Sequence, residues 1–303
     1  MGHHHSHTHH SVEQQGTKLL ISIFLNIVIT ASQVVGGLIS GSLALLSDAL
    51  HNFSDVLSLV VSYVAVKLSK NKATYARTFG YKRAEILAAF INAASLIIVA
   101  IFLIIEAYKR FLQPEEIQAN LVIWFALLGI VANGFSVLLL KKDAHNNMNM
   151  RSAYIHLFTD MLASLAVLIG GLLMRYFGLY WIDPLLTLII AMYLIYMGYD
   201  LLLASTRVLM LFTPKNINLK ALQADVSSVS CVKNIHHLHV WQLNEAEVHL
   251  EAHIELNTNL SVKEFDVVLL EIQDMLHEKY GINHLTLQPE FEKEDPKTPI
   301  IQD

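Results

Sequence analysis

Two His-x-x-x-Asp pairs, each inside a long apolar stretch, carry the residue types best suited to metal chemistry. The pairs are His51 with Asp55 and His156 with Asp160. On an α-helix, residues four positions apart share one face and lie about one turn from each other. Two imidazoles and two carboxylates offer four nitrogen and oxygen ligands, the tetrahedral kind of set that zinc prefers. The pattern predicts one divalent-metal site built by two helices.

A structural interpretation competes with this one, in which each histidine bonds its own aspartate and bends or docks a helix. Two identical spacings in two stretches favour the metal. The absence of thiol and thioether ligands from the pairs argues against copper(I), whereas cadmium, cobalt, nickel, iron and manganese stay open beside zinc. Asp48 lies one turn before His51. Asp48 is interpreted as a direct ligand, as a residue behind the ligands or as a proton carrier, and the sequence leaves these alternatives open.

The apolar stretches around the pairs are long enough to cross a membrane. Of 303 residues, 54% are hydrophobic and 16% are charged, against about 25% charged in ordinary soluble domains. A span needs about 20 apolar residues of helix. The stretches of this length are Leu19–Ile39, Leu43–Leu68, Ala84–Tyr108, Leu121–Leu140, Ser152–Phe177 and Trp181–Ser205. Residues 18–205 are therefore predicted to form an all-α bundle of six transmembrane helices. An aspartate at mid-membrane costs on the order of 3 kcal/mol, which makes the paired residues functional by default.

The positive charges predict the orientation of the bundle. Lysine and arginine gather between the second and third spans and between the fourth and fifth. Because basic loops face the cytoplasm and the number of spans is even, both termini are predicted to be cytoplasmic, in a protein of the inner cell membrane. Residues 1–17 are predicted to be a flexible histidine-rich segment, which is either native and able to gather zinc or an expression tag.

After Thr206 the composition becomes that of a soluble domain. The predicted elements are helix Asn218–Val229, strands Val232–Leu243 and Glu247–Leu256, helix Val262–Tyr280 and strand His284–Gln288. This α-β-β-α-β order predicts a cytoplasmic α+β domain over residues 206–291, with a flexible tail over 292–303. Along the second strand, apolar residues alternate with histidine and glutamate. Both a solvated polar face and a zinc-binding face fit that alternation.

Taken together, the motifs resemble the cation diffusion facilitator family, in its zinc-exporting branch. The matching segments are Ser47–Asp55, Phe79–Glu85, His156–Asp160, Trp181–Pro184 and His236–Trp241. The resemblance covers nearly the whole chain. It implies a metallochaperone-like cytoplasmic domain, a homodimer in the lipid bilayer, and export of zinc in exchange for protons.

The family pattern also implies which residues bind metal. The transport ligands carry over onto His51, Asp55, His156 and Asp160. The ligands of a regulatory zinc in the cytoplasmic domain carry over onto His236, His253 and Glu290, with His284 added. The alternation of the first cytoplasmic strand by itself does not separate His236, His237 and His239.

Two segments depart from the family pattern. The loop Thr74–Tyr81 has neither histidine nor aspartate. Some bacterial relatives hold a second metal there, and none is predicted here. The stretch Leu209–Pro214 is uncharged, where relatives often carry a carboxylate. A salt bridge from Lys82 or Arg83 to that point is therefore in doubt.

Composition and site chemistry narrow the function classes. The net charge of −5 does not indicate a basic surface of the kind that binds nucleic acid. The single cysteine excludes internal disulfides and Cys-x-x-Cys zinc motifs. An intramembrane zinc hydrolase would need an open metal position and a base, but four protein ligands saturate the metal. A membrane-anchored metal sensor is a further alternative, against which the polar residues within the spans argue. The sequence predicts a transporter and no enzyme.

Overall fold

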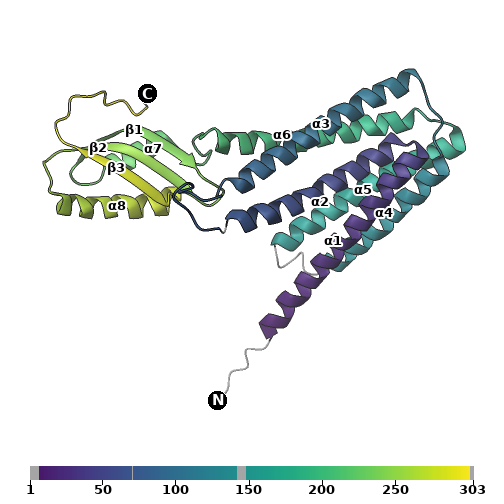
Figure 1. Ribbon diagram of the computed structural model, residues 1–303, viewed down its shortest axis with the longest axis horizontal. Coiled ribbons are helices and arrows are strands. Elements are labelled where there is room, and N and C mark those ends of the chain that lie inside the picture. The colour runs from purple at the N-terminus through teal and green to yellow at the C-terminus, as the bar shows by residue number, and fades with distance from the viewer. Residues whose placement is uncertain (1–6, 70, 142–147, 301–303) are drawn as a thin grey trace, which may run out of the picture. The chain divides into compact units, whose positions relative to one another are not determined.

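The structure of the protein is a computed structural model, which describes residues 7–69, 71–141 and 148–300 (Figure 1). Its elements are α1 (His7–Ser40), α2 (Leu43–Ser69), α3 (Ala84–Leu112), α4 (Ala119–Leu140), α5 (Met148–Phe177), α6 (Ile182–Leu209), α7 (Leu219–Ser227), β1 (Val232–Gln242), β2 (Val248–Leu256), α8 (Val262–Tyr280) and β3 (His284–Glu290). In the described part of the chain, α1, α3, α4, α5 and α6 each contain a stretch long and apolar enough to cross a membrane. The predicted class, a membrane helix bundle followed by an α-β-β-α-β domain, is confirmed.

The first helix begins earlier than predicted. Residues 7–17, expected to belong to a flexible segment, are helical and continuous with the first span. This stretch has no proline and contains good helix formers such as Glu13 and Gln14, so nothing in it stops the helix before the apolar part. His3, His4 and His5 lie outside the described residues.

The chain forms two compact units, Met1–Tyr63 with Ile91–Leu201 and Val64–Phe90 with Leu202–Asp303. In the first unit, one buried cluster joins α2, α4 and α5 and includes Leu45, Val122 and Met174. A second cluster joins α3 and α6, which run side by side in Figure 1. Other large apolar side chains of these helices are exposed. Helices that are apolar on all faces suit a lipid environment.

A buried carboxylate holds the start of α2 against the start of α6. Asp183, which is fully buried, accepts hydrogen bonds from the Ser42 hydroxyl at 2.5 Å, the Leu43 amide at 2.9 Å and the Ala44 amide at 3.3 Å. These amides belong to the first turn of α2, where the backbone N–H groups have no hydrogen-bond acceptor inside the helix. The negative charge also suits the positive end of the helix dipole. Asp183 thus fixes the entry of the helix that carries His51 and Asp55.

The second unit contains a three-stranded sheet in the order β1-β2-β3, with β1 antiparallel and β3 parallel to β2. Leu222 of α7, Ile254 of β2 and Ile272 of α8 share one buried apolar cluster. Helix α8 begins with a capping box, in which Ser261 and Glu264 each bond the backbone of the other. With both helices contributing to the apolar cluster, the polar residues of the strands are left on the other face of the sheet.

The segment after β3 differs from the predicted flexible tail. The carbonyls of Thr298 and Pro299 accept hydrogen bonds from the amides of His237 at 3.2 Å and Leu238 at 2.8 Å. Strand β1 lies at the edge of the sheet, so its outward amides need partners. The tail supplies them, which ties residues 293–299 to the sheet, while residues 301–303 lie outside the described residues.

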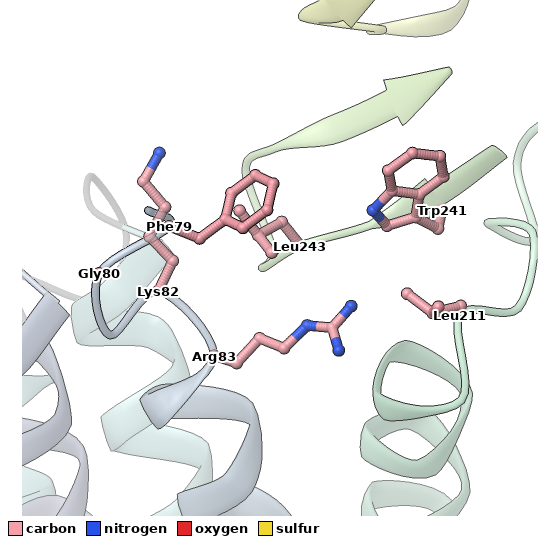
Figure 2. Close-up of a pocket in the computed structure, with 7 residues that line it drawn as sticks. All are labelled: Phe79, Gly80, Lys82, Arg83, Leu211, Trp241 and Leu243. Atoms are coloured by element: carbon pink, nitrogen blue, oxygen red, sulfur yellow. The ribbon is translucent and has the colours of Figure 1, made fainter. Parts of the chain in front are cut away.

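The connection between α2 and α3 contacts the sheet within the second unit. Lys82 Nζ lies 2.6 Å from Glu247 Oε2, at the turn between β1 and β2. The sequence put in doubt a salt bridge from Lys82 to Leu209–Pro214. In the structure, Lys82 pairs with Glu247 instead. A cavity of about 360 Å³ lies beside the pair. Figure 2 shows the Arg83 guanidinium directed into it, toward Trp241 and Leu211.

Candidate metal centre

Helices α2 and α5 bring the two His-x-x-x-Asp pairs together in the first unit. His51 Nε2 lies 3.7 Å from Asp55 Oδ2 on its own helix and 3.7 Å from Asp160 Oδ1 across the helix interface. His156 Nε2 lies 3.6 Å from Asp160 Oδ2 and 3.3 Å from Asp55 Oδ2. Each histidine therefore approaches both aspartates. The four side chains therefore lie together between α2 and α5, as their spacing in the sequence predicts.

The spacing of these atoms suits a tetrahedral metal. Ligand atoms that bind zinc at about 2.0–2.2 Å stand about 3.3–3.6 Å from one another along the edges of a tetrahedron. The four histidine–aspartate distances run from 3.3 to 3.7 Å. They are longer than most charge-assisted hydrogen bonds, which are about 2.7–2.9 Å. The four histidine–aspartate separations therefore approach tetrahedral edges. The four side chains do not form a group whose ligand atoms all lie within 4.8 Å of one another, which among the described residues only the cluster in the second unit does.

Unsatisfied polar atoms point to the same conclusion. Both carboxylate oxygens of Asp160, one oxygen of Asp55 and Nδ1 of His51 are buried without a hydrogen-bond partner among the described residues. Buried polar groups of this kind are rarely left unpaired. A divalent cation would satisfy the oxygens and cancel two negative charges at once.

The four side chains differ in exposure. The side chains of Asp160 and His51 are 0% and 7% exposed, whereas those of Asp55 and His156 are 30% and 37% exposed. The group is therefore buried at Asp160 and His51 and partly exposed at Asp55 and His156.

A polar network lies next to the ligands and joins three helices. Asp48 Oδ2 of α2 accepts hydrogen bonds from Gln33 Nε2 of α1 at 2.8 Å and from Ser164 Oγ of α5 at 3.0 Å. Asn52 donates to the Gln33 amide oxygen at 3.1 Å. Gly129 of α4 leaves room for the network, since a Cβ there would stand 2.8 Å from Gln33 Nε2 and 2.9 Å from Ser164 Oγ. We interpret Asp48 as a positioning residue for α2 and α5.

Asp48→Asn is expected to reduce metal transport about tenfold, the lower end of the loss that follows when residues that position metal ligands are replaced. An amide has one acceptor oxygen and no charge, so the bonds from Gln33 and Ser164 weaken. Transport by reconstituted protein and zinc titration of the same sample check this. Equal transport by the variant and the parent would contradict the positioning role.

The second predicted site lies on the polar face of the cytoplasmic sheet. His236 Nε2 lies 3.2 Å from Glu290 Oε2, and His253 Nδ1 lies 2.9 Å from Glu290 Oε1. His236 is fully buried, and neither of its ring nitrogens has a hydrogen-bond partner among the described residues. Burial lowers the pKa of His253 against the attraction of Glu290, which favours the neutral imidazole that metals bind.

A β-bulge explains why the pattern of β1 was ambiguous. His236 pairs with His253 and His239 pairs with Glu251, so three residues of β1 advance against two of β2. His237 sits in the bulge with a φ of 51°. The extra residue changes the parity of the strand. His236 lies 3.2 Å from Glu290, while the ring of His237 also lies against that of His253, with centroids 4.7 Å apart.

The structure does not bring His284 to this site. His284 pairs with His249 in the register of β2 and β3, and their ring centroids are 4.6 Å apart. His253 is paired with Gln288, four positions farther along β3. In its place the structure adds Asp295, whose carboxylate shares a cluster with His236, His253 and Glu290 in which the ligand atoms lie within 4.8 Å of one another.

Two lysines of the C-terminal segment also reach this cluster. Lys293 Nζ lies 2.6 Å and Lys297 Nζ 3.0 Å from the carboxylate of Glu290, and both lysines also pair with Asp295. Burial would raise the pKa of Glu290, but the hydrogen bonds from the two lysines prevail and lower it. The hydrogen bond from Lys297 likewise holds the pKa of Asp295 well below its usual range. In the sequence, Lys293 and Lys297 flank two acidic residues, and this grouping of charges is the one local signal for the contact.

The first unit is thus a bundle of long apolar helices in which two histidines and two aspartates converge. A family model of the cation efflux transmembrane domain matches residues 19–210, and one of the cation efflux protein cytoplasmic domain matches residues 214–292. The chain belongs to the cation efflux family, also called the cation diffusion facilitators. It is a transporter and not an enzyme, so the hydrolase and sensor alternatives no longer apply.

Curated relatives cover almost the whole chain. A "Cadmium, cobalt and zinc/H(+)-K(+) antiporter" of Bacillus velezensis is 37% identical over 96% of this chain and 92% of its own length. The "Metal cation efflux system protein CzcD" of Cupriavidus metallidurans is 33% identical over 96% and 91%. The "Zinc transporter ZitB" of Escherichia coli is 32% identical over 96% and 93%. The chain is thus similar to these three proteins over 96% of its length.

Proposed function

We propose that this protein exports zinc from the cytoplasm in exchange for protons, with His51, Asp55, His156 and Asp160 as the ligands of the transported ion. The observation that carries the proposal is the set of histidine–aspartate distances, 3.3 to 3.7 Å, around buried oxygens that have no other partner in the described chain. The names of the relatives support zinc as cargo and leave cadmium and cobalt as further substrates.

Proton exchange follows from the chemistry of the ligands. Metal binds only deprotonated imidazole and carboxylate, so binding releases protons and protonation releases metal. Histidine changes its charge near neutral pH, which allows it to exchange the two kinds of cation under physiological conditions. We propose an alternating-access cycle in which zinc binds from the cytoplasmic side, and proton entry from the other side displaces it.

Reconstituted vesicles test the coupling directly. With a zinc-sensitive dye inside, an acidic interior is expected to accelerate zinc uptake several-fold over vesicles without a pH gradient, and a protonophore is expected to remove the difference. Asp274→Asn, which alters an exposed carboxylate of α8 outside the membrane helices, is a matched control and should behave as the parent. Equal uptake with and without the pH gradient would disprove proton coupling, and acceleration by a potassium gradient alone would assign potassium as the counter-ion.

The cytoplasmic domain extends the proposal. We propose that His236, His253 and Glu290 bind a regulatory zinc, supported by their proximity and by the unpaired nitrogens of His236. We also propose a homodimer in the inner cell membrane with both termini in the cytoplasm. The homodimer is supported by the family model of the cytoplasmic domain, which is named for a dimer. The orientation is supported by the basic residues in the connections between helices.

A further inference from the structure

Two lysines of the C-terminal segment neutralise carboxylates at the site formed by His236, His253 and Glu290. Lys293 and Lys297 bridge the same two carboxylates, those of Glu290 and Asp295. The Glu290 side chain is 2% exposed and that of Asp295 is 18% exposed. Two carboxylates placed this close need compensation when they are withdrawn from water. In the metal-free protein, the two ammonium groups provide it.

The charges of this cluster match those of a divalent ion. Two carboxylates contribute −2, and two ammonium groups contribute +2. A zinc ion that replaced both lysines would leave the net charge of the cluster unchanged. Zinc that bound while both lysines stayed would add two positive charges beside two others, which costs free energy at such short range.

The backbone holds Asp295 at the site independently of the lysines. Thr298 and Pro299 accept hydrogen bonds from the amides of His237 and Leu238 in the bulge of β1. Asp295 Oδ2 lies 3.7 Å from His236 Nε2, a separation that two ligands of one tetrahedral zinc ion approach. The lysine side chains have long flexible stems, so they can leave the carboxylates while the backbone stays in place.

We propose that Asp295 is a fourth ligand of the cytoplasmic zinc site, and that Lys293 and Lys297 are built-in counter-ions that zinc displaces from Glu290 and Asp295. This inference rests on the proposed regulatory site at His236, His253 and Glu290. Its consequence is a site that is stable and electrically balanced without metal. The lysines lower its zinc affinity, and so raise the zinc concentration at which it fills.

Zinc titration of the full-length protein in detergent tests the proposal. The parent for these titrations carries His156→Ala and Asp160→Asn, so that the membrane site does not contribute. Lys297→Met and Lys293→Met are each expected to tighten zinc binding about tenfold, because a hydrogen-bonded competitor is removed. Asp295→Asn is expected to weaken it about tenfold or more, because a charged ligand is lost. Lys263→Met, on an exposed face of α8, changes the net charge equally and should leave the affinity as in the parent.

Chemical labelling of the lysines in the wild-type protein supplies a second readout. Acetylation of Lys293 and Lys297, followed by mass spectrometry, is expected to be several-fold faster with zinc bound than without, while Lys263 reacts equally in both states. A purely structural role of the lysines would leave their labelling independent of zinc. That result, or unchanged affinity in both lysine variants, would overturn the counter-ion role. Unchanged affinity in Asp295→Asn would overturn the fourth ligand.

Two further variants separate this inference from the regulatory site itself. Glu290→Gln and His236→Ala are each expected to remove one bound zinc from the titration parent. If neither does so, the regulatory site is wrong. If both do so while the Asp295 and lysine variants bind as the parent does, the site stands and only the role of the C-terminal segment fails. Thermal unfolding of each variant without zinc verifies that it is folded.

Discussion

Asp160→Asn is expected to abolish zinc transport while the protein stays folded. Both oxygens of Asp160 are buried without a hydrogen-bond partner in the described chain, and they face His51 and His156 at 3.7 and 3.6 Å. An amide of the same shape removes one of the two negative charges that offset the cation. Residues that only orient metal ligands already cost 10–100-fold when replaced, so loss of a ligand is expected to reduce flux by about 100-fold or more.

Zinc uptake into vesicles, normalised to the amount of folded protein, measures this loss. Thermal unfolding without metal is expected to match the parent, since the substitution preserves shape and removes an uncompensated buried charge. Asp274→Asn makes the same chemical change at an exposed position of α8, outside the membrane helices, and should transport normally. Persistent uptake by Asp160→Asn at near-parent rates would show that the four side chains are not the transport ligands.

Asp183→Ala is expected to have the opposite profile, with a large loss of stability. The carboxylate accepts three hydrogen bonds, two of them from amides in the first turn of α2. Hydrogen bonds to a charged group contribute about 1.5–3 kcal/mol each, and the donors left behind are buried. The free energy of unfolding should therefore fall by about 3 kcal/mol or more, which is a large part of the stability of most proteins.

The midpoint of thermal unfolding in detergent and the yield of monodisperse protein measure the effect. Asp274→Ala, at an exposed position of α8, is the matched control and should unfold as the parent does. Whatever folded Asp183→Ala protein can be recovered should still bind zinc at the four ligands, because Asp183 lies at the start of α6 and outside that set. An unfolding midpoint equal to that of the parent would contradict the role of Asp183 in fixing the start of α2.

The opposite outcomes expected for Asp160 and Asp183 show two uses of a buried carboxylate in this bundle. Among the described residues, the oxygens of Asp160 have no hydrogen-bond partner, whereas those of Asp183 are bonded to backbone amides and a hydroxyl. Only the first arrangement leaves acceptors for a mobile cation. The distinction depends on neighbours far away in the chain, since Asp183 and Leu43 are separated by 140 positions.

Features that depend on residues close together in the sequence could be predicted from the sequence alone. Hydropathy over about 20 residues predicts the membrane helices, because each one is long enough to satisfy its backbone internally and must be apolar to lie in lipid. The helical spacing of four places His51 beside Asp55 and His156 beside Asp160, and identical spacing in two helices predicts their shared site. The α-β-β-α-β order also follows from local periodicity, which depends on residues a few positions apart.

Features that depend on distant pairing were decided by the tertiary structure. One extra residue in β1 inverts the parity of the strand, which places His236 beside Glu290 and His237 beside His253. The register of β3 on β2 pairs His284 with His249 and leaves it out of the cluster. The C-terminal segment meets the edge of β1 and brings Asp295 and two lysines to Glu290. Each of these outcomes rests on which backbone amides and carboxylates lack a partner once the sheet has formed, and local sequence periodicity carries no information about that.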